Sequence, residues 1–450
     1  MKETQRNDFF GTESIPCIFL KVAPPVMLVQ LIQSLYNLVD SYFIGRISES
    51  GLTALAVIYP VQLLINALGV GTGIGVNTVM SRKYGEGKAE EAKACAGVGS
   101  FLAVITWLLF ALFAALFFAP YIRGTGASEA VMNQAVLYGR LVCCGSLPLF
   151  LDSVWTRIHQ AGGDMCRPMV AQIIGAGVNL IIDPILIFGV GIFPVMGIRG
   201  AAIATVTGQF AAACLNYSGG FYRIADYKKI GKYAYQIYKA GVPAMLMQAL
   251  FTVYISGLNL VLALYSETAV TVLGLYYKLQ TFFFIPFMAL ENCIVPVLSY
   301  NYGAKKWERC ALILLEAVIS GMGFMLIGTV CFELLPEQLL KIFTSGEQTL
   351  QIGRQAFRII GSSFIPAVPS LLIPIFFQAI GKGKESMFLT IMRQVVLFVP
   401  LAWIFGNIWG LSAIWYTFPA TELFTTAAGV LICRKVLKNS FPFCIKEVKE

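Results

Sequence analysis

The chain has 450 residues, of which 57% are hydrophobic and only 13% are charged, and long apolar runs recur from one end to the other. This composition excludes a soluble multidomain enzyme and is typical of a membrane protein with many helical spans. The net charge of +9 does not indicate nucleic-acid binding, because lysine and arginine are spread over many short loops instead of forming one basic surface.

Twelve apolar segments are long enough to cross a bilayer as helices. In chain order they are 16–44, 52–80, 95–119, 131–156, 168–190, 198–222, 240–264, 269–299, 310–335, 349–379, 386–406 and 411–433. Backbone polar groups in lipid must bond within their own segment, and the alternating pattern of a barrel strand is absent. No small-residue cleavage site follows the first segment, so we expect it to stay in the mature protein. The predicted fold is an all-α polytopic membrane protein.

The basic residues of the loops predict the orientation of these helices. The N-terminal segment, the C-terminal tail and the loops after even-numbered helices hold 23 Lys and Arg residues. The loops after odd-numbered helices hold four, which are Arg46, Arg123, Arg199 and Lys341. Because cytoplasmic loops carry the excess of positive charge, both termini are expected in the cytoplasm.

Two halves of the sequence resemble each other at a constant separation of 218 residues. SRKYGEGKAEEA (81–92) aligns with SYNYGAKKWERC (299–310), and QAGGDMCRPM (160–169) aligns with QAIGKGKESM (378–387). Six predicted helices separate the copies, so both have the same orientation, and we expect two pseudo-symmetric six-helix lobes that open alternately to each side. The predicted parts are an N-terminal lobe (1–222), a cytoplasmic linker (223–239), a C-terminal lobe (240–436) and a cytoplasmic tail (437–450).

The N-terminal copy alone carries polar groups at three positions inside the predicted helices. Asp40, Asn179 and Asp183 align with Leu258, Leu397 and Leu401. Asn179 and Asp183 are four residues apart, so they lie one turn apart on one helix face. A carboxylate at this depth is costly and is kept where it has partners or a function, although intramembrane Asn and Asp also serve as plain hydrogen-bonding groups between helices. We favour function, because two buried carboxylates in one lobe need a proton or a metal cation to stay together.

Prolines accompany both groups of polar residues. Pro184 follows Asp183 directly and is predicted to kink the helix and free a backbone carbonyl one turn earlier. In the first helix, Tyr36, Asn37 and Asp40 share one face, and Pro24 and Pro25 are predicted to bend that helix.

Five stretches resemble the multidrug and toxic compound extrusion (MATE) family, and the likeness runs over essentially the whole chain. They are LYNLVDSYFIGR, NLIIDPILIFGVGIFPVMGIRGAAIAT, the YGEGK and NYGAKK loops, and YYKLQTFFFIPFMALENCIVPVLSYNYGA. The resemblance implies an antiporter that exports organic cations and other drugs by taking up Na⁺ or H⁺, in the prokaryotic branch with its cation site in the N-terminal lobe. Such a protein is expected in the inner membrane of a prokaryote. The positions that match this cation site are Asp40, Asn179, Asp183 and Thr205.

The sequence departs from the family pattern at several polar positions. Glu291-Asn292-Cys293 stands where relatives commonly have Asn-Asn-Gly, Gln160 replaces the usual arginine, and Asp152 with Thr156 falls near positions that are often amides. Candidates for the substrate cleft are Tyr36, Asn37, Tyr138, Asp152, Thr156, Lys278 and Glu291. Lys278 and Glu422 are intramembrane charges for which a structural ion pair and a role in a cavity are both open.

Alternatives from other classes are weaker but remain open. An exporter or flippase of lipid-linked or polysaccharide precursors shares the superfamily architecture, but it would need a cationic cleft, and the intramembrane acids outnumber Lys278. A single histidine (His159), no metal-ligand spacing among the eleven cysteines and no nucleotide loop argue against an enzyme or an ATP-driven pump. We expect a monomer without a cofactor, and no metal beyond a possible Na⁺ at Asp40, Asn179 and Asp183.

Overall fold

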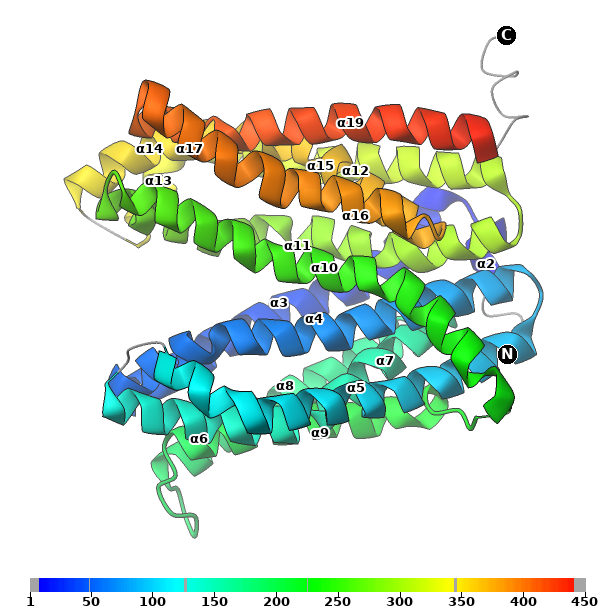
Figure 1. The fold of residues 1–450 in the computed structure, drawn as a ribbon, viewed down its shortest axis with the longest axis horizontal. Coiled ribbons are helices and arrows are strands. Elements are labelled where there is room, and N and C mark those ends of the chain that lie inside the picture. Colours follow the sequence, from blue (N-terminus) through cyan, green and yellow to red (C-terminus); the bar gives the residue numbers. More distant parts are fainter. Residues whose placement is uncertain (1–7, 48, 125–127, 225, 344–345, 441–450) are drawn as a thin grey trace. The chain divides into compact units, whose positions relative to one another are not determined.

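The structure is a computed structural model, and every regular element in its described residues is helical (Figure 1). It describes residues 8–47, 49–124, 128–224, 226–343 and 346–440; the side chains of 36–47, 49–52, 56, 130 and 437–440 are outside this description. Tyr36, Asn37 and Asp40 therefore lie in a described helix, but their side chains lie outside the described residues.

The helices follow one another with short connections. In the first half they are α2 (Phe9–Thr12), α3 (Ile15–Ile47), α4 (Glu49–Gly85), α5 (Ala89–Gly124), α6 (Glu129–Gly145), α7 (Leu147–Ala161), α8 (Cys166–Phe188) and α9 (Ile198–Gly220). In the second half they are α10 (Ile230–Ala263), α11 (Glu267–Gly303), α12 (Trp307–Leu334), α13 (Pro336–Lys341), α14 (Glu347–Gly361), α15 (Phe364–Ala379), α16 (Gly383–Ile391), α17 (Phe398–Trp409), α18 (Leu411–Ile414) and α19 (Thr417–Ser440). A 3₁₀ turn (Tyr227–Lys229) precedes α10, and a π-helix (Met392–Leu397) joins α16 to α17.

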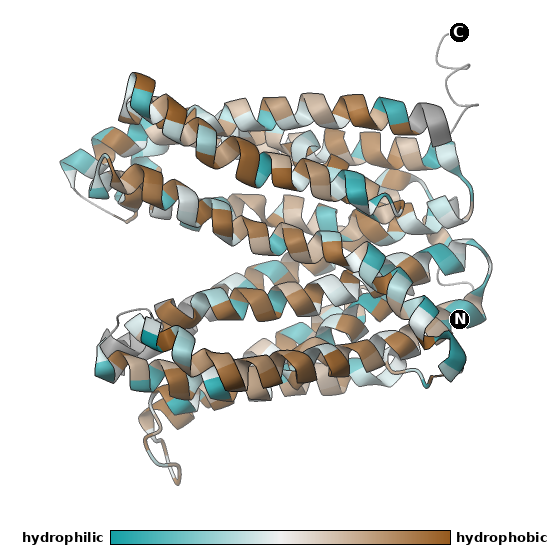
Figure 2. Cartoon of the chain, in the orientation of Figure 1, coloured by the Kyte–Doolittle hydropathy of each residue, from teal (hydrophilic) through white to brown (hydrophobic). Residues whose placement is uncertain are grey.

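Helices occur at all twelve predicted places. Among the described residues, nine helical segments are long and apolar enough to cross a membrane, and two more spans appear as bent pairs of helices. The twelfth predicted span, 411–433, coincides with α18 and α19. Hydrophobic residues dominate these helices (Figure 2), which agrees with a multi-pass membrane protein.

Two spans that the sequence presents as single helices are broken. The predicted span 131–156 is α6 and α7, which meet at 44°, and the predicted span 349–379 is α14 and α15, which meet at 52°. Each break follows a glycine, Gly145 or Gly361, and precedes a proline, Pro148 or Pro366. A proline in the first turn of a helix loses no intrahelical bond, so it favours a new start there.

The chain forms two compact units. Unit 1 comprises residues 1–12 and 24–245, and unit 2 comprises residues 13–23 and 246–450. In unit 1, α4 packs on α5 and α7, and α9 packs on α7 and α8. In unit 2, α11 packs on α12, and α15 packs on α12 and α19. The lobe and linker boundaries inferred from the sequence stay predictions, although α10 already begins inside the segment 223–239.

The repeat is visible in the backbone of four helix–helix turns. Gly87 (φ 74°) and Lys305 (φ 59°) are 218 residues apart, and so are Gly163 (φ 78°) and Gly381 (φ 79°). In each turn the residue at positive φ is followed by an amide that donates to the carbonyl five residues earlier, as in a Schellman motif. These bonds are Lys88 to Lys83 (2.9 Å), Lys306 to Asn301 (3.0 Å), Asp164 to His159 (2.9 Å) and Lys382 to Phe377 (2.7 Å). The two units therefore share turn geometry where their side chains differ.

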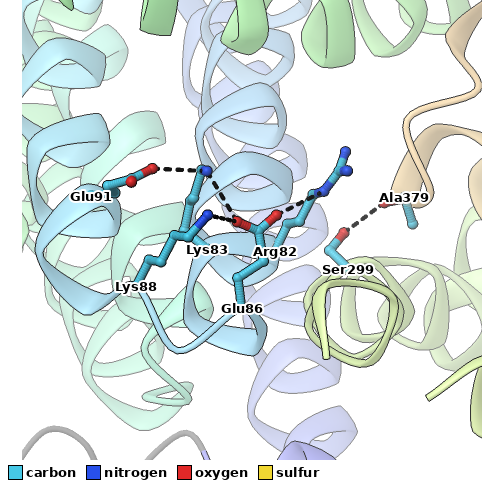
Figure 3. A network of polar contacts seen from close by, with 7 residues as sticks. All are labelled: Arg82, Lys83, Glu86, Lys88, Glu91, Ser299 and Ala379. Carbon is cyan, nitrogen blue, oxygen red and sulfur yellow. Dashed lines mark hydrogen bonds and ion pairs between the residues drawn. The ribbon is translucent and has the colours of Figure 1, made fainter. Parts of the chain in front are cut away.

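Charged side chains surround the first of these turns (Figure 3). Glu86 contacts Lys83 and Lys88 at 3.1 Å each and Arg82 at 3.4 Å, while Lys83 also reaches Glu91 at 2.8 Å. Partial burial opposes the charge of Glu86, but hydrogen bonds from Lys83 and Lys88 outweigh it and lower the pKa of this carboxyl from its usual value. In unit 2, the residue that aligns with Ser81 is Ser299, which donates to the carbonyl of Ala379 at 3.0 Å.

Candidate functional site

The centre of the predicted cation site is a buried acid and amide on α8. Asn179 is 5% exposed and Asp183 is 1% exposed, and their spacing places them one turn apart on one face of this helix. The Nδ2 of Asn179 has no hydrogen-bond partner among the described residues. A buried amide without a partner is costly, so this face of α8 has an unused donor beside a carboxylate.

The neighbouring helix α9 comes unusually close to Asn179. Gly208 of α9 has no side chain, and a Cβ there would lie 2.9 Å from the Cβ of Asn179 and 2.7 Å from the carbonyl oxygen of Gly175. Only glycine fits such a contact, so α8 and α9 pack closely beside Asn179. Thr205 lies one turn before Gly208 on α9 and donates its hydroxyl to the carbonyl of Ala201 at 2.9 Å, which leaves its oxygen lone pairs to accept a bond or bind a cation.

The three prolines that were predicted to kink helices, Pro24, Pro25 and Pro184, lie inside continuous helices. α8 continues through Pro184 to Phe188, and α3 continues through Pro24 and Pro25. The predicted kinks at these prolines stay predictions. Of the four predicted cation-site residues, the structure places Asn179, Asp183 and Thr205 on α8 and α9 of unit 1.

Asp152 of α7 is the centre of a hydrogen-bond network in unit 1, which the sequence did not predict. It is 7% exposed, and each of its carboxylate oxygens accepts from an amide: Oδ1 from Asn216 Nδ2 at 2.7 Å, and Oδ2 from Gln172 Nε2 at 2.5 Å. Asn216 Nδ2 also lies 3.1 Å from Thr156 Oγ1, and Gln172 Oε1 accepts from Gln33 Nε2 at 3.3 Å. Asp152 and Thr156 are thus joined to α3, α8 and α9 by amides that the sequence did not single out.

The other cleft candidates have different environments. Tyr138 is 1% exposed and accepts from Gln62 Nε2 at 3.2 Å, which ties α6 to α4. Lys278 is exposed, and no acid among the described residues pairs with it. Glu291 is half-buried, and the described part of the chain gives it no hydrogen bond.

Glu422 has the structural ion pair that the sequence left open. Its carboxylate is bound by Arg393, with Nη2 2.6 Å from Oε1 and Nε 3.1 Å from Oε2, and it also accepts from the hydroxyl of Ser370. The side chains of Arg393 and Glu422 are only 11% and 4% exposed. The sequence analysis missed Arg393, although an arginine inside an apolar span is itself a signal for a buried acid on another helix.

Within the described residues, no group of three or more His, Cys, Asp or Glu side chains could hold a metal ion. A Na⁺ site on α8 and α9 would therefore be built from one acid of these helices with amide, hydroxyl and backbone oxygens, which are ligands that hard cations accept.

Comparison with known proteins defines the class. The MatE family model matches residues 25–185 and 243–404, two copies whose starts are 218 residues apart (243 − 25), the separation of the repeat in the sequence. Two repeated helical units that cross the membrane many times are typical of a transporter. The chain belongs to the MATE family, whose members are transporters and not enzymes.

Similar proteins agree with this assignment. The chain is 25% identical to the "FAD transporter" of Shewanella oneidensis over 89% of this chain and 90% of the relative. It is 24% identical to "Multidrug export protein MepA" of Staphylococcus aureus, over 91% of each. Among solved structures, an outward-facing multidrug resistance MATE transporter has a TM-score of 0.89 at 23% identity, covering 98% of each chain. A transporter of the same superfamily from Pyrococcus furiosus also has a TM-score of 0.89 at 23% identity, covering 97% of this chain and 99% of that one. At this identity the structures show the shared fold.

Proposed function

We propose that this transporter exports organic cations in exchange for Na⁺ or H⁺, and that Asp40, Asn179, Asp183 and Thr205 of the N-terminal lobe hold the coupling ion. The observation that carries this proposal is the pair on α8: Asp183 is 1% exposed, and the Asn179 one turn away is 5% exposed with an unused amide donor. A carboxylate buried at this depth favours a bound proton or cation.

The coupling follows from competition for one charge. A free carboxylate in unit 1 attracts a cationic substrate, whereas a carboxylate that holds H⁺ or Na⁺ offers it less charge. Ion binding and substrate binding therefore oppose each other, and each ligand shifts the balance between inward- and outward-open states by its difference in affinity. Substrates are expected to be flat, aromatic and cationic, because ring faces attract cations and soft apolar contacts discriminate poorly between related molecules.

A second candidate substrate class is a nucleotide-like organic anion. Two observations favour it: one similar protein is named a FAD transporter, and Lys278 is an exposed cation in the first third of α11 without an acid partner among the described residues. Phosphate groups require a cation in the binding site, and an unpaired lysine provides one.

Transport in proteoliposomes under an imposed ΔpH or ΔNa⁺ tests both candidates. Wild-type protein should expel ethidium under one of the two gradients, and excess FAD should leave that flux unchanged. Asp183→Asn should reduce gradient-driven flux at least tenfold without changing thermal stability in detergent. The matched control is Asp152→Asn, the same change at another buried acid of unit 1, which should retain most of the flux.

The same experiment separates the outcomes. FAD flux that is lost in Lys278→Gln would favour the anion exporter. Two results would contradict coupling at α8: wild-type flux that responds to neither ΔpH nor ΔNa⁺, and full gradient-driven flux in Asp183→Asn. Transport of a lipid-linked precursor and of neither probe would favour the lipid-precursor exporter.

A further inference from the structure

The buried charges of unit 2 lie on the helix pair that repeats the acid-bearing pair of unit 1. Adding 218 to the bounds of α8 gives 384–406, the region of α16, the π-helix and α17, and adding it to α9 gives 416–438, the region of α19. In unit 1 this pair carries Asp183 and Thr205. In unit 2 it carries Arg393 and Glu422, which lie on the π-helix and on α19.

The helix pairs are related, but their charges differ in kind and position. Arg393 aligns with Gly175, and Glu422 aligns with Ala204, both uncharged and buried in unit 1. Asp183 aligns with Leu401 in unit 2. Unit 2 thus contains a carboxylate that is already neutralised by a cation of the chain itself, and this cation, Arg393, lies eight residues before Leu401, the position equivalent to Asp183.

Besides Arg393, one hydroxyl group bonds to the Glu422 carboxylate, and three more hydroxyl groups are buried on the same helix. Ser370 donates its hydroxyl to Oε2 of Glu422. Three threonines of α19, spaced four residues apart, are 0–1% exposed, and their hydroxyl oxygens have no hydrogen-bond partner among the described residues; they are Thr417, Thr421 and Thr425. Carboxylate and hydroxyl oxygens are the ligands that a hard cation prefers, and the same groups hydrogen-bond to a protonated acid.

Several features hold Arg393 in place. Arg393 lies on the π-helix Met392–Leu397. This π-helix is followed by Pro400, which lacks the amide hydrogen that an α-helix would bond to the carbonyl of Val396. The guanidinium carbon of Arg393 lies 5.3 Å from the ring centroid of Phe398, a cation–π distance. Together with two bonds to Glu422, these contacts make the guanidinium a fixed part of unit 2.

We propose that Arg393 is a tethered cation that permanently occupies a cation site centred on Glu422, and so prevents the C-terminal unit from binding an exchangeable Na⁺ or H⁺. Its role in transport rests on the proposed coupling at Asp183, because it confines ion exchange to the N-terminal unit. The other titratable groups within electrostatic reach of Arg393 in the described residues are Tyr254, Tyr276, Tyr277 and Glu291, all in unit 2.

The test removes the tether and counts cations. Arg393→Met keeps the length of the side chain and deletes its charge, so the purified variant should bind about one more Na⁺ per chain at pH 8, or about one more H⁺ without Na⁺ at pH 5.5. Arg393→Met/Glu422→Gln should lose this gain, whereas Arg393→Met/Glu291→Gln should retain it. Arg393→Lys keeps the charge and should bind no additional cation.

Measuring the same variants in an Asp183→Asn background separates this inference from the proposed function, because the gain at Glu422 should persist there. If Arg393→Met does not fold, purification at pH 5.5 or in high Na⁺ should rescue it. Failure of both rescues while the Glu422→Gln double variant folds would overturn the proposal. So would an additional cation bound by Arg393→Lys, or an unchanged cation count in folded Arg393→Met.

Discussion

The network around Asp152 gives a prediction that separates a structural acid from a functional one. Asp152→Asn removes the charge and turns one carboxylate acceptor into an NH₂ donor. Asn216 Nδ2, which donates to Asp152 Oδ1 at 2.7 Å in the wild-type structure, can keep its bond to the oxygen that remains in the variant. The new donor faces Gln172, whose amide can flip so that its oxygen accepts. Gln33 is half-buried and can flip in turn, so the hydrogen bonds that link Gln33, Gln172 and residue 152 are retained.

We therefore expect Asp152→Asn to lower the free energy of unfolding by less than about 1 kcal/mol, the usual net value of one hydrogen bond. Asp152→Ala leaves Nε2 of the half-buried Gln172 without an acceptor, whereas Asn216 keeps Thr156 Oγ1 at 3.1 Å. One donor that loses its partner away from water costs about 1–3 kcal/mol, so Asp152→Ala should lower the free energy of unfolding by about 1–3 kcal/mol.

The measurement is a pair of assays on the same preparations. Denaturant titration or thermal melting in detergent reports stability, and ethidium flux in proteoliposomes reports transport. The expected pattern is a stable and active Asp152→Asn and an unstable Asp152→Ala. An inactive Asp152→Asn of normal stability would show that Asp152 acts through its charge, and equal destabilisation by both changes would show that the amides cannot rearrange.

Three further predictions concern the helix–helix turns and the orientation of the chain in the membrane. The pKa of the Glu86 carboxyl is lowered in the folded chain. The ionised carboxylate therefore stabilises the fold fully above its unfolded pKa, and this stabilisation disappears as the pH falls through the folded pKa. Between about pH 6 and pH 3, the wild-type protein should lose more thermal stability than Glu86→Gln. Gly87→Ala places a side chain at φ 74°, where nothing lies within 4 Å of the new Cβ and only the backbone is strained. It should lower the free energy of unfolding by about 1–2 kcal/mol. Lys305→Gly in the equivalent turn should be neutral or slightly stabilising in the same thermal melt. A single cysteine at Lys232, in a chain without the native cysteines, should react with an impermeant reagent only after cells are opened, and one at Lys341 should react in intact cells; the reverse pattern would mean that the orientation is wrong.

Hydrophobic length and charge in the loops were enough to predict where the helices lie, because both are local properties of the sequence. The breaks at Gly145 and Gly361 were missed, since an uninterrupted apolar run favours one span even where Gly and Pro allow two helices. The Gly-Ser-Leu-Pro sequence at 145–148 was the available signal, and Pro366 marks the second break in the same way.

The polar interior was harder to predict than the helices. Asn179 and Asp183 are one turn apart in the sequence itself, so their shared face followed from helical periodicity. Arg393 and Glu422 are 29 residues apart on different helices, and the amides around Asp152 come from three other helices, so these contacts depend on packing that no local pattern encodes. Lys278 is also a basic residue inside an apolar helix, but unlike Arg393 it has no acid partner among the described residues. The residue type alone therefore does not predict which basic residue is paired.

The four turns at Gly87, Gly163, Lys305 and Gly381 also bear on how the protein is made. Each closes through bonds between residues at most five apart, so it needs no contact with distant parts of the chain. Such a turn can form as soon as its two flanking segments have left the ribosome. During synthesis, α4 with α5, α7 with α8, α11 with α12, and α15 with α16 can therefore enter the bilayer as preconnected hairpins, and later packing only has to bring finished pairs together.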